Sequence, residues 1–231
     1  MVSSVRARDA HRGGRVRGDR PWRIVGQGAA ALAAGMFVAL LVSYTLEGAG
    51  YIIAGTFLVA AVGQSTPGWA GSGAWILAGL AALPSTALWA RLSRTRSRPA
   101  LLRAALAVQA VGIALPALTG GVWAALVSAA LFGATFLGVA TLTLGIGAGL
   151  RVPRSVAILT TGYSAGQIIG PVIVTPLLPH GYAPALLVGA ALVVLAAAVA
   201  STTNERNTND QHRNPYSPDR SEPVESWGGR P

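Results

Sequence analysis

The residue of this sequence whose type and position could do chemistry is Glu47. It is the only carboxylate between Asp19 and Glu205, and it lies in an apolar run that extends from residue 24 to residue 62. An ionisable side chain in such a run is costly to bury, and it is read by default as a functional site. Without a basic partner, burial favours the neutral form. We therefore expect Glu47 to bind a proton in one state and to lose it in another, and a cationic substrate could take the proton's place.

Two apolar segments carry stripes of residues that are spaced three and four apart and so share one face of a helix. The stripes are Tyr44, Glu47, Tyr51 and Gly55, and Thr160, Tyr163, Gln167 and Pro171. Lipid cannot satisfy polar groups, so such stripes face protein or water. We expect their three tyrosines and the glutamine to contact a substrate beside the carboxyl group.

Glycines gather in the same two segments. They are Gly48, Gly50 and Gly55 in the first, and Gly162, Gly166 and Gly170 in the second. The second set recurs every fourth residue, which is the pattern by which membrane helices pack closely. The alternative is that these glycines let the backbone approach a substrate. The first set would allow local bending, as Pro171 would in the second segment.

Residues 162–166 also match the Gly-x-Ser-x-Gly pattern of a nucleophile elbow. That motif needs a preceding strand and a histidine base. Here the segment reads as a membrane helix, and the three histidines lie outside the apolar segments, at His11, His180 and His212. We expect Ser164 to be a packing residue and the protein not to be an enzyme. Scattered histidines and the lack of cysteine also argue against a metal site, and we expect no cofactor.

The composition indicates a membrane protein. Of the 231 residues, 52% are hydrophobic and 11% charged, whereas soluble domains carry about 25% charged residues. Six apolar segments are long enough to cross the hydrocarbon core. They cover residues 30–62, 73–92, 101–119, 122–149, 155–178 and 183–201. The expected fold is an all-α polytopic membrane protein with six transmembrane helices.

The charges decide between six spans and seven. Residues 24–65 could form two spans broken after Glu47, but the arginines that follow the next segment would then lie outside the cell. With six spans, the loops at 63–72, around 120 and at 179–182 contain no arginine, and all 18 basic residues lie on the other side. The positive-inside rule then predicts cytoplasmic termini and a multi-pass protein of the cell (inner or plasma) membrane. The net charge of +10 reflects this topology, not nucleic-acid binding.

The two ends of the chain are predicted to be disordered cytoplasmic tails. Residues 1–23 are basic and lack apolar periodicity, and the apolar run behind them is too long for a signal peptide. Residues 202–231 are rich in Asn, Pro, Ser and Arg, a composition typical of disorder. The membrane domain is therefore expected to occupy residues 24–201.

Three stretches resemble a known family. Residues 47–60 read Glu-Gly-Ala-Gly-Tyr-Ile-Ile-Ala-Gly-Thr-Phe-Leu-Val-Ala, and 131–138 and 166–171 follow in the same order. They resemble the YbfB/YjiJ branch of the major facilitator superfamily (MFS), and the first is similar to its seventh helix. The resemblance covers roughly residues 30–200 and reaches only the C-terminal six helices of a twelve-helix transporter.

This resemblance implies one half of the MFS fold, in which the third and sixth helices lie outside and the others line the cavity. The polar content agrees, because residues 185–200 of the sixth segment have no polar side chain and the third segment has only Gln109 in its middle. We therefore expect both of these segments to face lipid.

The implied function is secondary transport of a small molecule, with Glu47 as the proton-coupling group. One acid among Tyr, Thr and Gln suits cations and amphiphiles slightly better than anions. Complete transporters rock two six-helix halves about a shared site, so we expect a second copy or a separate N-terminal half as partner. The alternative is a truncated, non-transporting remnant or an accessory membrane subunit.

Overall fold

The computed structural model describes residues 21–65, 68–150 and 152–213. These residues form six α-helices and one 3-10 helix. Each α-helix contains a segment that is long and apolar enough to cross a membrane, and in the fifth this segment continues through the 3-10 helix. The helices are α1 (Pro21–Ser65), α2 (Trp69–Leu92), α3 (Arg98–Thr119), α4 (Gly121–Gly149), α5 (Ser155–Val174), the 3-10 helix η1 (Thr175–His180) and α6 (Tyr182–Arg213). The prediction of an all-α protein with six helices that can cross a membrane is confirmed.

Most of the two predicted tails lies outside the described residues. At the C-terminal end, α6 continues as a helix to Arg213, beyond residue 201, where the sequence places the end of the membrane domain. The part of α6 that is apolar enough to cross a membrane ends at Thr202. The predicted apolar boundary and the end of the helix are therefore different positions.

Glycines make the sharp turns at one end of the bundle. Gly120 and Gly121 have φ angles of 65° and 80° between α3 and α4, and Gly181 has a φ of 96° between η1 and α6. Side-chain-bearing residues rarely adopt these left-handed angles, whereas glycine does so at little cost. At the other end, α3 begins with a proline in its first turn, where the missing N–H needs no partner.

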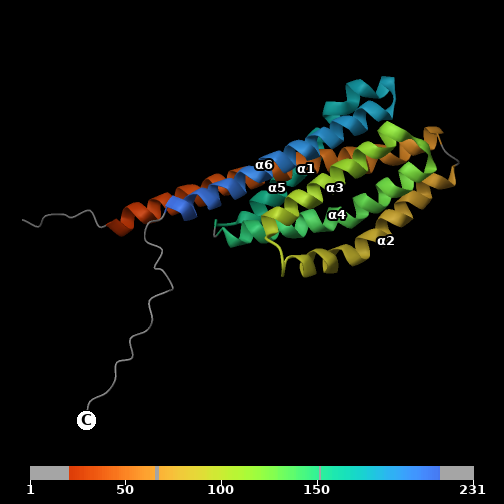
Figure 1. The fold of residues 1–231 in the computed structure, drawn as a ribbon. Helices are drawn as coiled ribbons and strands as arrows, with labels where there is room; N and C mark the ends of the chain where they lie inside the picture. The colour runs from red at the N-terminus through yellow and green to blue at the C-terminus, as the bar shows by residue number, and fades with distance from the viewer. Residues whose placement is uncertain (1–20, 66–67, 151, 214–231) are drawn as a thin grey trace, which may run out of the picture.

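Successive helices run in opposite directions, so their ends gather in two groups (Figure 1). The start of α1, the loop between α2 and α3, the connection from α4 to α5 and the end of α6 lie at one end, which we call the inner end. Within the bundle, α1 packs against α5 and α6, α3 lies between α4 and α6, and α2 packs on α4. Residues far apart in the chain thus meet around α1.

Helices α3 and α6 each have one buried face and one exposed face. On α3, Gln109 is fully buried while Val111 is 59% exposed; on α6, Val193 is fully buried while Val194 is 56% exposed. The expectation that α3 faces lipid therefore holds for one side of the helix only. Its single central polar residue points into the protein, because lipid offers an amide no hydrogen-bond partner.

Candidate functional site

Glu47 lies in the middle of α1 and is only 1% exposed. Its Oε1 accepts a hydrogen bond from Nε2 of Gln109 on α3, at 3.0 Å. Among the described residues, neither Glu47 Oε2 nor Gln109 Oε1 has a hydrogen-bond partner. Leaving a buried polar atom without a partner costs free energy. The carboxyl group therefore keeps one oxygen available to take up a proton.

Three tyrosines from the predicted site come together beside this carboxyl group. The rings of Tyr44 on α1 and Tyr163 on α5 are stacked, with centroids 4.6 Å apart. The ring of Tyr51 lies 6.1 Å from that of Tyr163, tilted by 41°. Tyr44 is buried, whereas the other two are half-buried. The structure thus joins the tyrosines of the two stripes into one aromatic group.

The remaining polar positions of the α5 stripe lie closer to the surface. Gln167 is half-buried, one turn beyond Tyr163. Thr160 is exposed, and its hydroxyl donates to the Val156 carbonyl oxygen at 2.9 Å, a bond within its own helix. Pro171 is half-buried near the end of α5, where the chain continues as the 3-10 helix η1.

The glycine face of α5 lies directly against α1. A Cβ atom added at Gly166 would clash with the carbonyl oxygen of Thr45, and one at Gly170 would lie 2.6 Å from that of Ala49. At Gly162, a Cβ atom would collide with side chains of α1. At Gly166 and Gly170 the two backbones therefore touch, as those of close-packed membrane helices do.

The glycines of α1 differ from one another in their surroundings. A Cβ atom at Gly48 would lie 2.5 Å from the carbonyl oxygen of Tyr163, and one at Gly50 would lie 2.6 Å from that of Gly189. At Gly55 the nearest atom, on Trp75, is 4.0 Å away. Gly48 and Gly50 therefore bring α1 close to α5 and α6, and α1 continues through them as an α-helix.

The segment that matches a nucleophile elbow lies inside helix α5. Ser164 is exposed there, and the glycines on either side of it are the ones that pack against α1. The strand that must precede such an elbow is replaced by the first two turns of the helix. Within residues 21–65, 68–150 and 152–213, no three His, Asp or Glu side chains lie close enough to hold a metal ion.

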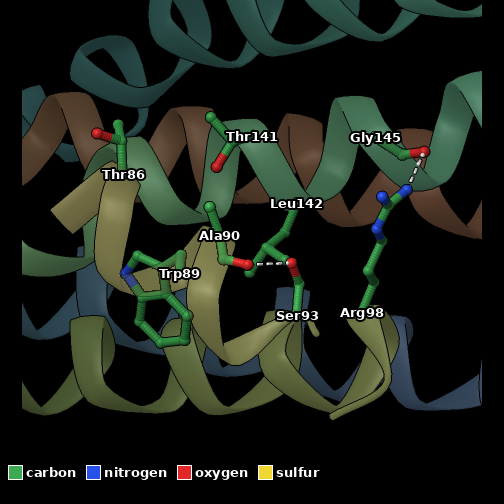
Figure 2. Close-up of a pocket in the computed structure, with 8 residues that line it drawn as sticks. All are labelled: Thr86, Trp89, Ala90, Ser93, Arg98, Thr141, Leu142 and Gly145. Carbon is green, nitrogen blue, oxygen red and sulfur yellow. Dashed lines mark hydrogen bonds between the residues drawn. The ribbon is translucent and has the colours of Figure 1, made fainter. Parts of the chain in front are cut away.

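A separate cavity of about 350 Å³ opens between the inner ends of α2 and α4 (Figure 2). Arg98, at the start of α3, donates from Nη1 to the Gly145 carbonyl oxygen at 3.4 Å. The indole Nε1 of Trp89 donates to the Ala134 carbonyl oxygen at 2.8 Å. None of the predicted site residues lines this cavity. These two side chains tie α2 and α3 to the backbone of α4.

Gln109 is the site residue that the sequence did not predict. The sequence feature that could have indicated Gln109 is its position as the single polar residue in the middle of the third apolar segment. Helical spacing could not say which way it points, because it stands alone on its helix. Ser43 was also missed: its buried hydroxyl donates to the Ala196 carbonyl oxygen at 2.8 Å and joins α1 to α6.

Comparison with known proteins identifies the family. No curated protein and no solved structure matches this sequence. A family profile described as "uncharacterised MFS-type transporter YbfB" matches residues 27–201, a range that covers four of the six α-helices completely and most of α1 and α6. The resemblance seen in the three sequence stretches is thereby confirmed. The chain belongs to the YbfB family of MFS-type transporters, and it is a multi-pass membrane protein.

Proposed function

We propose that this protein is a proton-coupled secondary transporter of a small molecule in the cell membrane, with Glu47 as the proton-binding group. The observation that carries the proposal is a carboxyl group, 1% exposed, whose one hydrogen-bond partner among the described residues is the neutral amide of Gln109. An arginine or lysine partner would hold the carboxylate in its charged form. A neutral partner leaves its protonation open to the charge of a nearby ligand.

The Gln109 amide can serve both protonation states of Glu47. An amide carries two N–H donors and a carbonyl acceptor. The Nε2 group donates to the carboxyl oxygen, and Oε1 has no partner in the described structure. A protonated Glu47 would gain a donor, which Oε1 could accept after a small rotation of either side chain. The carboxyl group can therefore keep a hydrogen-bond partner in both protonation states.

The proposed substrate contacts are Tyr44, Tyr51, Tyr163 and Gln167. The first three form the aromatic group next to Glu47, and the fourth lies one turn further along α5. A substrate held by these side chains would lie near enough to the carboxyl group for its charge to influence the proton. Such coupling is what the exchange of a proton for a substrate requires.

We also propose that the bundle works together with a second six-helix unit. Transporters of this superfamily rock two six-helix halves, related by an axis along the membrane normal, around a site between them. The unit is either a second copy of this chain or a separate N-terminal half. The native mass of the purified protein in nanodiscs distinguishes the two: a dimer supports the second copy, and a monomer supports the separate half.

Infrared difference spectroscopy at two pH values tests the proton site without knowledge of the substrate. The wild-type protein in lipid should show a protonated-carboxyl band that Glu47→Gln lacks. Glu205→Gln, which changes a carboxyl beyond the apolar part of α6, is the matched control and should keep the band. In proteoliposomes, transport by Glu47→Gln should lose its dependence on a proton gradient. Transport that keeps its full proton dependence in this variant rules out the proposal.

A further inference from the structure

A cavity of about 140 Å³ lies between α1, α2 and α4, and one of its walls is aromatic. The Tyr51 ring is stacked with that of Phe132, with centroids 5.1 Å apart, and with that of Phe136, at 4.8 Å. Trp75 meets Phe132 edge-on at 6.4 Å, and its side chain is 45% exposed. Four aromatic side chains thus present rings to one small space.

The rest of the lining consists of small residues, most of them on α2. Ala78 and Ala82 line the cavity together with Gly79. A Cβ atom at Gly133 on α4 would clash with the carbonyl oxygen of Ala78, so the two backbones touch beside the cavity. A Cβ atom at Gly79 would meet nothing within 4 Å. This cavity, which we call the slot, is therefore closely packed at Gly133 and has open space at Gly79.

The volume and the lining of this slot suit one planar ring. Apolar cavities of about 150 Å³ in proteins hold a benzene molecule. Aromatic rings gain additional energy when they stack at an offset on other rings, and a wall of alanine and glycine leaves room for a flat group. The carboxyl group of Glu47 is bonded to Gln109 and does not line the slot. A cationic group in the slot would thus find no acidic partner there.

We propose that this slot binds an uncharged six-membered aromatic ring carried by the transported substrate. The inference rests on the proposed transport function and adds to it the chemical class of the substrate. Tyr51 connects the two regions, because it lines the slot and also lies 6.1 Å from the Tyr163 ring. A substrate with its ring in the slot would extend its polar part toward the tyrosines beside Glu47.

The probes for this proposal are benzyl alcohol and cyclohexylmethanol, which share a polar group but differ in the planarity of the ring. Binding to the full-length protein in nanodiscs is measured by saturation-transfer NMR, with empty nanodiscs as background. Benzyl alcohol should bind the wild type, and on the order of tenfold more tightly than cyclohexylmethanol. Equal binding of the two would overturn the proposal, since the slot would then accept any apolar group, a lipid chain included.

Gly79→Leu fills the slot, and Gly63→Leu is its matched control. Both glycines have open space around them, but Gly63 does not line the slot. We expect Gly79→Leu to weaken benzyl alcohol binding on the order of tenfold, and Gly63→Leu to leave it unchanged. If Gly79→Leu does not fold, Phe136→Leu keeps an apolar side chain, removes one stacking ring and should weaken binding as well. Wild-type binding in a folded pocket variant contradicts the proposal.

The outcome is separable from that of the transport proposal. Ring binding is measured at equilibrium with no proton gradient, so its readout is independent of the proton-dependence assay. Loss of proton dependence in Glu47→Gln together with unselective ring binding would overturn the ring site alone. Selective ring binding together with proton dependence that survives Glu47→Gln would overturn the proton site alone.

Discussion

The middle of α1 and the inner end of α2 are both packed against glycine-containing helices, but at very different distances. Along α1, two glycines of α5 leave no room for a side chain, because a Cβ atom at Gly166 or Gly170 would collide with the α1 backbone. On its other side, Gly50 lies just as close to the backbone of α6. The centre of α1 is therefore held by backbone contacts on two sides.

The contact between α2 and α4 opens toward the inner end. A Cβ atom at Gly133 would clash with the α2 backbone, and one at Gly138 would clash with the indole of Trp89. At Gly145, the nearest atom belongs to the Arg98 guanidinium group, 3.6 Å from such a Cβ atom, which is an ordinary contact. Toward the inner end, side-chain atoms replace backbone atoms as the nearest neighbours of the α4 glycines. The cavity of Figure 2 lies where side chains no longer fill the space between the helices.

This difference indicates where the bundle tolerates change. Where backbone touches backbone, an added methyl group has nowhere to go, since neither helix can move without losing its other contacts. Where side chains fill the space, rotamer changes can absorb a substitution. We therefore expect substitutions around α1 to cost more than those at the inner end.

The largest effect is expected for Gly166→Val. The valine side chain would force α5 away from the α1 backbone, and such overpacking costs about 3 kcal/mol. Gly145→Val on α4 is the matched control, because it makes the same chemical change where the contact is ordinary, and it should cost less than about 1 kcal/mol. Denaturant unfolding of both variants in the same detergent provides the measurement. Equal destabilisation would show that the two contacts do not differ.

An intermediate effect is expected for Gln109→Leu. It removes the hydrogen bond to Glu47 and leaves a buried carboxyl group without its partner. Side-chain hydrogen bonds inside membrane bundles are worth about 1 kcal/mol. In a double-mutant cycle, Glu47→Leu should cost less in the Gln109→Leu background than in the wild type. Additive unfolding energies would mean that the bond contributes nothing to stability.

The smallest effect is expected for Arg98→Gln. Its bond to the Gly145 carbonyl oxygen is long, at 3.4 Å, and the side chain is exposed, so the loss should stay below about 0.5 kcal/mol. Trp89→Phe removes a shorter bond, at 2.8 Å, from a buried indole and should cost about 1 kcal/mol. Thermal unfolding of the two variants ranks them. A larger loss of stability for Arg98→Gln than for Trp89→Phe would contradict the expected order of these two contacts.

Much of the fold was predictable because a membrane constrains each segment by itself. A helix must be long and apolar enough to cross the hydrocarbon core, and length and composition can be read without knowing the neighbours. The six apolar segments agree with the six helices to within a few residues at most ends. The exceptions are the start of α1, at Pro21 where the predicted segment begins at residue 30, and the end of α6. The polar continuation of α6 to Arg213 has a composition that does not indicate a helix.

The candidate site was predictable in part. Helical spacing placed Tyr44, Glu47 and Tyr51 on one face, and the structure brings Tyr163 of the second stripe against them. The partner of the carboxyl group was not predictable. Gln109 lies 62 residues further along the chain, on a helix whose other central residues are apolar, and a lone polar residue defines no stripe.

By itself, the sequence determined the number of spans, the isolation of Glu47 among apolar residues and the expected side of every arginine. These properties depend on the identity of each residue and on its distance along the chain. Only the tertiary structure decided that Gln109 faces Glu47 and that a ring-sized slot lies between α1, α2 and α4. Spacing along a helix tells which residues share a face, but the neighbour of that face is set by how six helices pack together.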